Sequence, residues 1–192
     1  PDGTWHCTVP EGRRCAPPLI DLARTYRASR AVERGQDTAQ DLRWLRGKGT
    51  SLGGMRPKCT MVDEDGHLAI GKFASVDDTR SVTRGEVLAL KLAAKAGIDA
   101  ASARIVSLRG DDDHNVVVPV AVIRRFDRAR SEGDDDARIP YQSAASLLQA
   151  PRDAEDRSYT DIVDAIRALG HAPTRDVRQL WRRLVFNLLI TN

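Results

Sequence analysis

The sequence contains few cysteines and no long apolar run, and these absences exclude several classes of protein. Its 3 cysteines, Cys7, Cys15 and Cys59, are an odd and sparse set that fits a reducing cytoplasm better than a disulfide framework. No apolar run approaches the roughly 18 residues that cross a bilayer, and residues 1–5 lack the basic-then-apolar order of a signal peptide. We therefore expect a cytoplasmic protein with no membrane partner.

A metal-binding pattern and a strong excess of charge are missing as well. His6, Cys7 and Cys15 match no Cys-x-x-Cys spacing, so we expect no zinc site. The net charge is only +3 over 192 residues, and the arginines are scattered, which is too little to indicate direct binding of nucleic acid. With 41% hydrophobic and 30% charged residues, the composition is that of a folded globular protein.

The periodicity of apolar residues predicts two β-hairpins with a helix between them, followed by helices only. The expected strands are 58–62, 68–73, 103–108 and 116–126, and the expected helices are 19–26, 37–45, 83–97, 159–169 and 174–192. The Asp65-Gly66 pair favours the tight turn of the first hairpin, because that turn needs positive φ. Thr83 and Glu86 have the spacing of a capping box at the start of the central helix, and Gly97 ends it.

This order of elements predicts an α+β fold. We expect a protein-kinase-like small lobe, made of an antiparallel sheet plus a helix, followed by the first helices of an α-helical large lobe. The lead-in covers residues 1–46, the small lobe 47–130, and the incomplete helical lobe 131–192. Thr38 and Asp41 have capping-box spacing in the lead-in. The order alone is weak evidence, since many α+β domains share it.

A Gly-rich segment lies directly before the first expected strand. Gly53 and Gly54 let the backbone approach an anion closely, and successive N–H groups can then surround phosphate oxygens. A Gly-Gly pair is more often only a turn, and the Walker pattern G-x-x-x-x-G-K-[ST] is absent. On the residues alone, both interpretations stay open.

Lys72 and Glu86 form a second candidate pair. Lys72 ends the second expected strand among apolar neighbours, so it needs a partner or must extend to water. In a kinase, such a lysine contacts the nucleotide phosphates and pairs with a glutamate on the following helix, where Glu86 lies. The alternative is a solvated edge lysine and a glutamate that only caps the helix.

Together these motifs resemble those of the HipA family, from about residue 17 to the end. The matching segments are Ser51-x-Gly53-Gly54-x-x-Pro57-Lys58, Lys72-Phe73, the helix from Glu86 to Gly97-Ile98, Arg125-Phe126-Asp127-Arg128, Tyr159-x-Asp161-x-x-x-Ala165-Ile166-Arg167, and Leu184-Val185-Phe186-Asn187-x-Leu189-Ile190-x-Asn192. Several spaced motifs in one order make the resemblance specific. A plain structural α+β domain is the unrelated alternative.

The resemblance implies a serine/threonine protein kinase of a type II toxin–antitoxin module, with ATP and Mg²⁺ as cofactors. Its substrate would be a protein, by resemblance an aminoacyl-tRNA synthetase, and its partner a HipB-like helix-turn-helix antitoxin, through which alone it would meet DNA. The residues implied to bind ATP are Gly53, Gly54, Met55, Arg56, Pro57 and Lys58 at the phosphates, Lys72 with Glu86 as its ion-pair partner, and Arg124, Arg125 and Phe126 at the adenine hinge. Ser51 lies at the family's autophosphorylated position, where a phosphate would disfavour nucleotide binding.

In the family, the motif that Asn192 begins continues into Thr-Asp-Asp-His and an asparagine, which supply the catalytic base and a magnesium ligand. We therefore expect no catalytic residue within these 192 residues and nucleotide binding without measurable kinase activity. We favour a sequence cut short from an active kinase. The alternative is a genuine short form, a non-catalytic pseudokinase or an antitoxin-binding module. The last helix should expose an apolar face.

Overall fold

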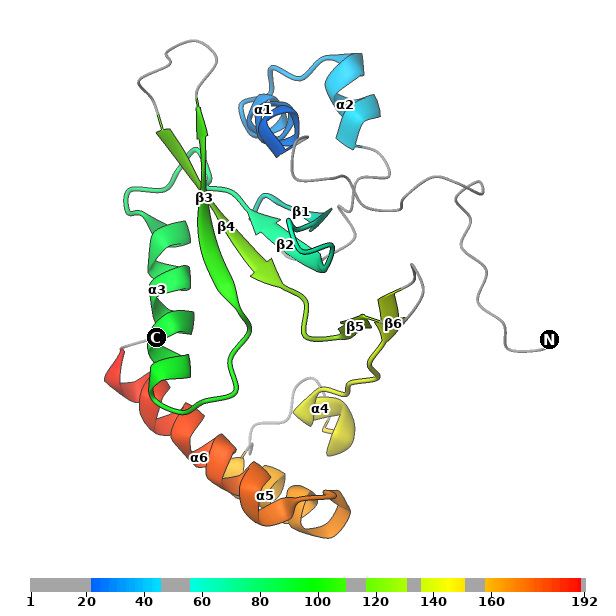
Figure 1. The fold of residues 1–192 in the computed structure, drawn as a ribbon, viewed down its shortest axis with the longest axis vertical. Helices are drawn as coiled ribbons and strands as arrows, with labels where there is room; N and C mark the ends of the chain where they lie inside the picture. The colour runs from blue at the N-terminus through cyan, green and yellow to red at the C-terminus, as the bar shows by residue number, and fades with distance from the viewer. Residues whose placement is uncertain (1–21, 46–55, 110–116, 131–135, 151–157, 191–192) are drawn as a thin grey trace, which may run out of the picture.

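The computed structural model describes residues 22–45, 56–109, 117–130, 136–150 and 158–190. In chain order its elements are α1 (Leu22–Glu33), α2 (Ala39–Leu45), β1 (Lys58–Val62), β2 (Leu68–Lys72), α3 (Val82–Lys95), β3 (Ala103–Arg109), β4 (Val117–Arg124), β5 (Arg128–Arg130), β6 (Asp136–Arg138), α4 (Ala144–Leu147), α5 (Tyr159–Leu169) and α6 (Pro173–Leu189). The predicted α+β class is confirmed. A four-stranded sheet lies at the centre, with α1 and α2 towards one end of the molecule and α5 and α6 at the other (Figure 1).

The central sheet is antiparallel and joins the two expected hairpins at their inner strands. Its strand order is β1-β2-β4-β3. Where β2 pairs with β4, Ile70 lies opposite Ile123 and Lys72 lies opposite Ala121. Because side chains alternate along a strand, these four project from one face of the sheet, and Gly71 belongs to the other.

The main apolar core lies on the face of the sheet that α1 covers. Its buried residues are Leu22, Cys59, Met61, Ala69, Phe73, Val120 and Val122. Gly71 belongs to this face, where an added methyl group would come within 3.1 Å of the Met61 sulfur and 3.2 Å of the Cys59 sulfur. Burial raises the pKa of the Cys59 thiol to about 12, so this cysteine is an unreactive core residue.

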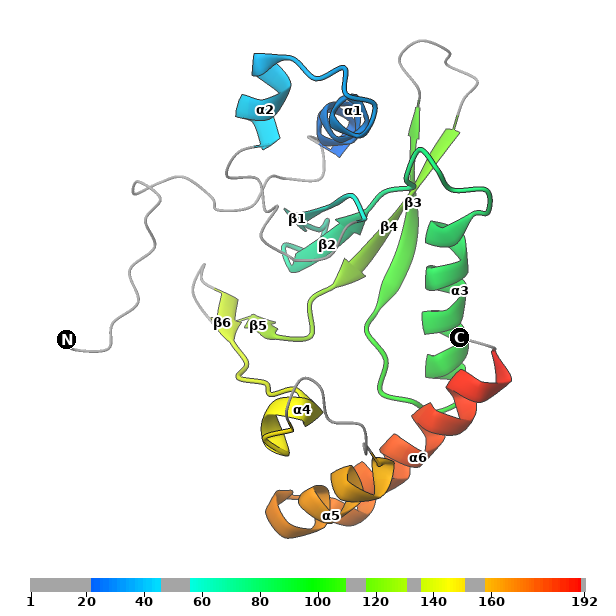
Figure 2. The same ribbon diagram turned by 180° about the vertical axis from the view of Figure 1, so that it is seen from behind.

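The opposite face of the sheet packs against α3, which runs alongside β3 and β4 (Figure 2). Val87 and Ala93 of the helix are buried in this contact. Leu88 and Leu92 remain exposed, at 58% and 43% of their surface. The apolar contact that holds α3 is therefore modest, and the polar contacts of the helix matter for its position.

After β4 the chain forms a second, two-stranded sheet before it becomes helical. In this sheet β5 pairs with β6, and Ala129 lies opposite Ala137. The prediction of helices only after the second hairpin is therefore wrong, because strands of 3 residues are too short to show a period in the sequence. Beyond α4, α5 packs against α6, and α6 reaches the C-terminal end of α3 (Figures 1 and 2).

The expected exposed apolar face on the last helix is confirmed. Trp181, Leu188 and Leu189 of α6 are 63%, 79% and 76% exposed. These side chains make α6 a helix with one face that the described residues do not cover. None of the described helices is long and apolar enough to span a membrane.

The two expected capping boxes had different outcomes. Thr38 and Asp41 cap α2 as predicted: the Asp41 N–H donates to Thr38 Oγ1 at 3.2 Å, and the Thr38 N–H donates to Asp41 Oδ2 at 2.9 Å. The predicted box at Thr83 and Glu86 is wrong, because Thr83 already lies inside α3 and the Glu86 side chain turns to the sheet. Gly97 follows α3 with a φ of 73°, as its predicted role at the helix end requires.

Candidate functional site

A lysine–glutamate ion pair joins the sheet to α3. Lys72 is the last residue of β2, and its Nζ donates to Oε1 of Glu86 in the second turn of α3. Strand alternation directs Lys72 to the α3 face, where the small side chain of Ala121 lies opposite it. Both charged side chains are partly exposed, at 31% and 32%, so the pair borders solvent. The structure therefore favours the paired lysine over the solvated edge lysine.

A bidentate arginine–aspartate pair lies between the start of β1 and the connection from β2 to α3. Arg56 Nη1 and Nη2 donate to Asp78 Oδ2 and Oδ1 at 2.9 and 2.7 Å. The same carboxylate accepts the Ser75 N–H at 3.0 Å, and the Ser75 hydroxyl donates to Glu33 of α1 at 2.7 Å. The hydrogen bonds from Arg56 lower the pKa of Asp78. Arg56, expected at the phosphates, is thus tied to an aspartate that the sequence analysis did not single out.

The other residues expected at the phosphates are only partly described. The Pro57 carbonyl accepts the Phe73 N–H at 3.0 Å. Lys58 lies opposite Lys72 in the β1–β2 pair, so the segment entering β1 runs beside the strand end that carries the ion pair. Four further predicted residues lie outside the described residues: Ser51, Gly53, Gly54 and Met55. Their roles stay predictions.

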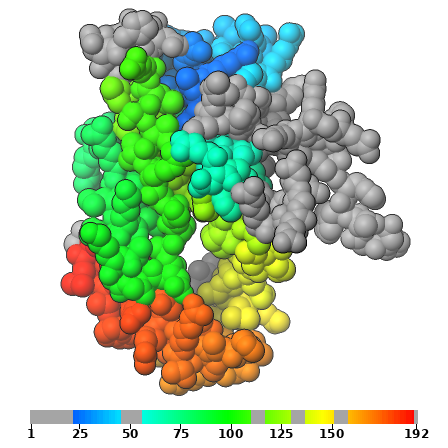
Figure 3. Space-filling model, viewed as in Figure 1, coloured from blue at the N-terminus to red at the C-terminus, as the bar shows by residue number. Residues whose placement is uncertain are grey.

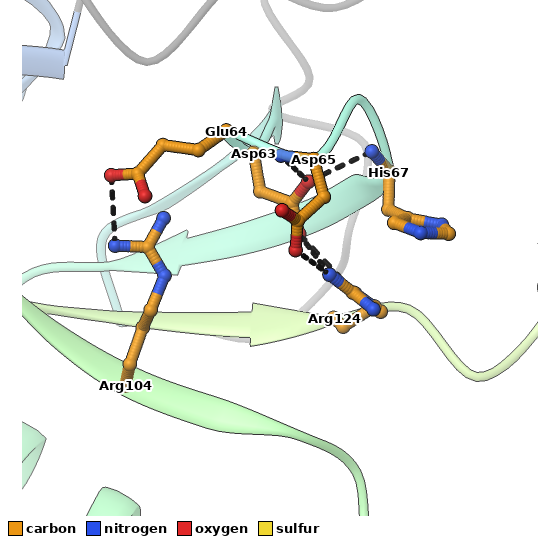
Figure 4. Close-up of polar contacts among 6 residues, drawn as sticks. All are labelled: Asp63, Glu64, Asp65, His67, Arg104 and Arg124. Atoms are coloured by element: carbon orange, nitrogen blue, oxygen red, sulfur yellow. Dashed lines mark hydrogen bonds and ion pairs between the residues drawn. The ribbon is translucent and has the colours of Figure 1, made fainter.

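Arg124, expected at the adenine hinge, binds the turn of the first hairpin (Figure 4). Its Nη2 lies 3.0 Å from Asp63 Oδ2 and 2.6 Å from Asp65 Oδ2. Asp63 is nearly buried and also accepts the His67 N–H at 2.8 Å. Burial alone would raise the pKa of Asp63, but the hydrogen bonds from His67 and Arg124 outweigh it and lower the pKa. The end of β4 is therefore anchored to the turn between β1 and β2.

Arg125 and Arg128 share one buried carboxylate, that of Asp127. Arg125 Nε and Nη2 donate to Asp127 Oδ1 and Oδ2 at 2.8 and 2.5 Å. Arg128 Nη1 donates to Asp127 Oδ2 at 2.7 Å. Asp127 is 7% exposed, and the hydrogen bond from Arg125 lowers its pKa. Since the Arg125 N–H also donates to the Leu68 carbonyl at 2.9 Å, the segment 124–128 between the two sheets is held from several sides.

Phe126 and Tyr141 form an exposed aromatic pair beside this segment. Their ring centroids lie 5.1 Å apart in an edge-to-face arrangement, and the two residues are 66% and 68% exposed. An exposed aromatic ring offers a surface on which a planar base can stack. Phe126 was an expected site residue. Tyr141 was not, because no motif near it in the sequence singles it out.

Among the described residues, the arrangement can hold an anion but offers no metal site made of protein side chains alone. The described ranges contain no group of three or more His, Cys, Asp or Glu side chains that could hold a metal ion by themselves. A Mg²⁺ ion that is bound mainly through nucleotide phosphates needs only one or two protein carboxylates. The ammonium group of Lys72 has three N–H donors and a compact positive charge. Glu86 Oε1 accepts a hydrogen bond from Lys72 Nζ, and this bond fixes the position of the ammonium group. A positioned ammonium of this kind can bind and orient a phosphate group.

Three carboxylates with structural roles at the site escaped the sequence analysis as individual residues: Asp63, Asp78 and Asp127. Each pairs with an arginine that is itself a predicted site residue. Only Asp127 had a usable signal, since it lies between its two arginine partners in the sequence. The other two bind arginines far away in the sequence, which no spacing rule reveals.

A family model described as the HipA-like C-terminal domain matches residues 50–192. The matched range includes Lys72, Glu86 and the segment 124–128. No curated protein and no solved structure matches the chain.

Proposed function

Because the chain belongs to the HipA family, we propose that it is the nucleotide-binding part of a serine/threonine protein kinase. In this proposal the four-stranded sheet and α3 form a kinase-like small lobe, and α5 and α6 begin a helical large lobe. The γ-phosphate of ATP would pass to a serine or threonine hydroxyl of a protein target, and to Ser51 of the chain itself.

The Lys72–Glu86 ion pair is the single observation that carries the proposal. Protein kinases need a strand lysine that contacts the nucleotide phosphates and a glutamate on the next helix that holds it. Here Lys72 ends a central strand, and Glu86 lies on the helix that follows in the chain. A plain structural domain gains little from such a partly exposed pair, which makes a binding role the better explanation.

The remaining described residues are consistent with a nucleotide between the sheet and the segment 124–128. We place the phosphates near Lys72 and the segment that enters β1, and the adenine beside the exposed ring of Phe126. By resemblance to the family, the catalytic base and a ligand of Mg²⁺ are expected just after Asn192. For these residues, therefore, the proposal is nucleotide binding.

The target and the partner follow from family membership alone. We propose an aminoacyl-tRNA synthetase as the protein substrate, and a HipB-like helix-turn-helix antitoxin as the partner that contacts DNA. Both would meet the chain in the cytoplasm.

Titration of the fluorescent nucleotide MANT-ATP into the purified chain tests the proposal. Lys72→Met keeps the length of the side chain but removes the ammonium, and we expect it to weaken binding by about tenfold or more. Lys91→Met is the matched control, since Lys91 is an exposed lysine on α3, and it should bind as the wild type does. Equal affinity of Lys72→Met and the wild type, with both folded by circular dichroism, overturns the proposal.

A further inference from the structure

The C-terminal end of α3 is held by four side chains of α6, which we call the α6 clamp: Arg175, Gln179, Arg182 and Arg183. Two of them bind Gly97, the second residue after the helix. Gln179 Nε2 and Arg182 Nη1 donate to the Gly97 carbonyl at 3.0 and 2.9 Å. The fit is close, since a methyl group added to Gly97 would lie 3.2 Å from Arg182 Nη1.

The other contacts of the α6 clamp converge on Asp99, two residues further on. The Asp99 N–H donates to Gln179 Oε1 at 3.1 Å, and Arg175 Nη2 lies 2.9 Å from Asp99 Oδ2. Arg183 Nη2 donates to the Asp99 carbonyl. Carbonyl groups at a helix C-terminus carry partial negative charge, which the arginines of the clamp offset. Figure 3 shows α6 lying directly against this end of α3.

The N-terminal end of α3 has few contacts of its own to fix it. Ser81, the residue before the helix, makes no side-chain capping bond. The Thr83 hydroxyl is buried and has no hydrogen-bond partner among the described residues. Of the 14 residues of α3, Thr83, Val87 and Ala93 are buried. We therefore infer that α3 depends on its two polar anchors, the ion pair of Glu86 near one end and the α6 clamp at the other.

We propose that the α6 clamp positions Glu86 against Lys72, which makes Arg182 and Gln179 positioning residues for the nucleotide site. Glu86 and Lys95, the last residue of α3, lie about 14 Å apart along the helix axis at about 1.5 Å per residue. A helix of this length moves as one body, so a displacement at its C-terminal end moves Glu86. The inference rests on the proposed function for its nucleotide readout. It adds a route of control: a protein that displaces α6 would weaken nucleotide binding without touching the site.

The first test compares two substitutions on the same helix. Arg182→Gln removes the charge and the forked geometry of one clamp residue, and it should weaken MANT-ATP binding about threefold or more. Arg178→Gln is the control, because Arg178 is an exposed arginine of α6 outside the clamp, and it should leave the affinity unchanged. If Arg182→Gln fails to fold in a thermal melt, Gln179→Ala, which removes fewer contacts, takes its place.

A double-mutant cycle with Glu86→Gln separates positioning from general destabilisation. If the α6 clamp acts through Glu86, Arg182→Gln changes the affinity little once Glu86 has lost its charge. If the two substitutions instead act independently, their changes in binding free energy add in the double variant. That result would overturn the proposal.

Amide hydrogen exchange in the nucleotide-free chain keeps this inference distinct from the proposed function. We expect faster exchange across residues 82–90 in Arg182→Gln than in the wild type or Arg178→Gln. Faster exchange together with a wild type that binds no MANT-ATP would support the positioning of α3 and refute the nucleotide role. Unchanged exchange across 82–90 would overturn the positioning itself.

Discussion

The two terminal nitrogens of Arg56 donate to the two carboxylate oxygens of Asp78, at 2.9 and 2.7 Å. The pair connects a residue that lies two positions before the start of β1 with the segment between β2 and α3. A bidentate pair fixes the plane and the orientation of the guanidinium. Arg56 therefore tethers the segment that enters β1, whereas the resemblance to the family implies a phosphate ligand at this position.

A tether and a phosphate ligand give different results when both partners are changed. We expect Arg56→Gln and Asp78→Asn each to lower the urea midpoint of unfolding by a similar amount. The double variant should be little worse than either, because the same interaction is lost. MANT-ATP affinity should fall equally in the two single variants. A much larger loss of affinity in Arg56→Gln than in Asp78→Asn would show instead that Arg56 contacts the phosphates.

Two glycines that look alike in the sequence should respond in opposite directions to alanine. Gly71→Ala should destabilise the fold by about 1–3 kcal/mol, since its methyl group would lie 3.1 to 3.3 Å from Met61, Cys59 and Leu22. Gly85 lies inside α3 with nothing within 4 Å of an added methyl group, so Gly85→Ala should stabilise by about 0.5–1 kcal/mol. Urea unfolding measures both. An unchanged unfolding free energy in Gly71→Ala would mean that the side chains around this glycine rearrange at little cost to accept the methyl group.

The buried carboxylate of Asp127 should make stability depend on pH in the acid range. The hydrogen bond from Arg125 holds its pKa below the ordinary value of 3.8. A lowered folded pKa gives a contribution that is complete above about pH 5 and is lost as the pH falls through the unfolded and then the folded value. Asp127→Asn leaves two guanidiniums without their charged partner, so at neutral pH it should cost about 3 kcal/mol.

Urea unfolding from about pH 7 down to about pH 3 measures this dependence. The difference in unfolding free energy between wild type and Asp127→Asn should stay constant down to about pH 5 and then narrow. Asp161→Asn, which changes an exposed carboxylate on α5, should follow the wild type throughout. A difference that does not narrow would assign the loss to packing rather than to charge.

The elements with a regular period or a turn signal could be predicted from the sequence. β1 was predicted to the residue, and β2 to within one residue of its end, because alternating residues flank the Asp65-Gly66 turn. α5 was also predicted with its observed bounds. α1 extends to Glu33, well past the predicted end at residue 26, since its last turns alternate small apolar residues with arginines and show no clear apolar stripe.

The side-chain pairs at the site were far less predictable. Lys72 and Glu86 were recognised as candidates, but the residues alone could not tell a pair from two solvated side chains. Arg124 was placed at the hinge, and nothing in its neighbourhood predicted a contact with Asp63, 61 positions earlier. Long-range pairs depend on how hairpins and helices dock, and docking leaves no periodic trace in the sequence.

The order β1-β2-β4-β3 also sets the route by which this sheet can form. Each hairpin pairs strands that are close in the chain, so each can close quickly. The seam between β2 and β4, where Ile70 meets Ile123, requires the chain to close a loop that contains all of α3 and β3. That closure carries the entropy cost of a long loop and precedes the gain from buried contacts. We therefore expect the joining of two preformed hairpins to limit the rate of folding.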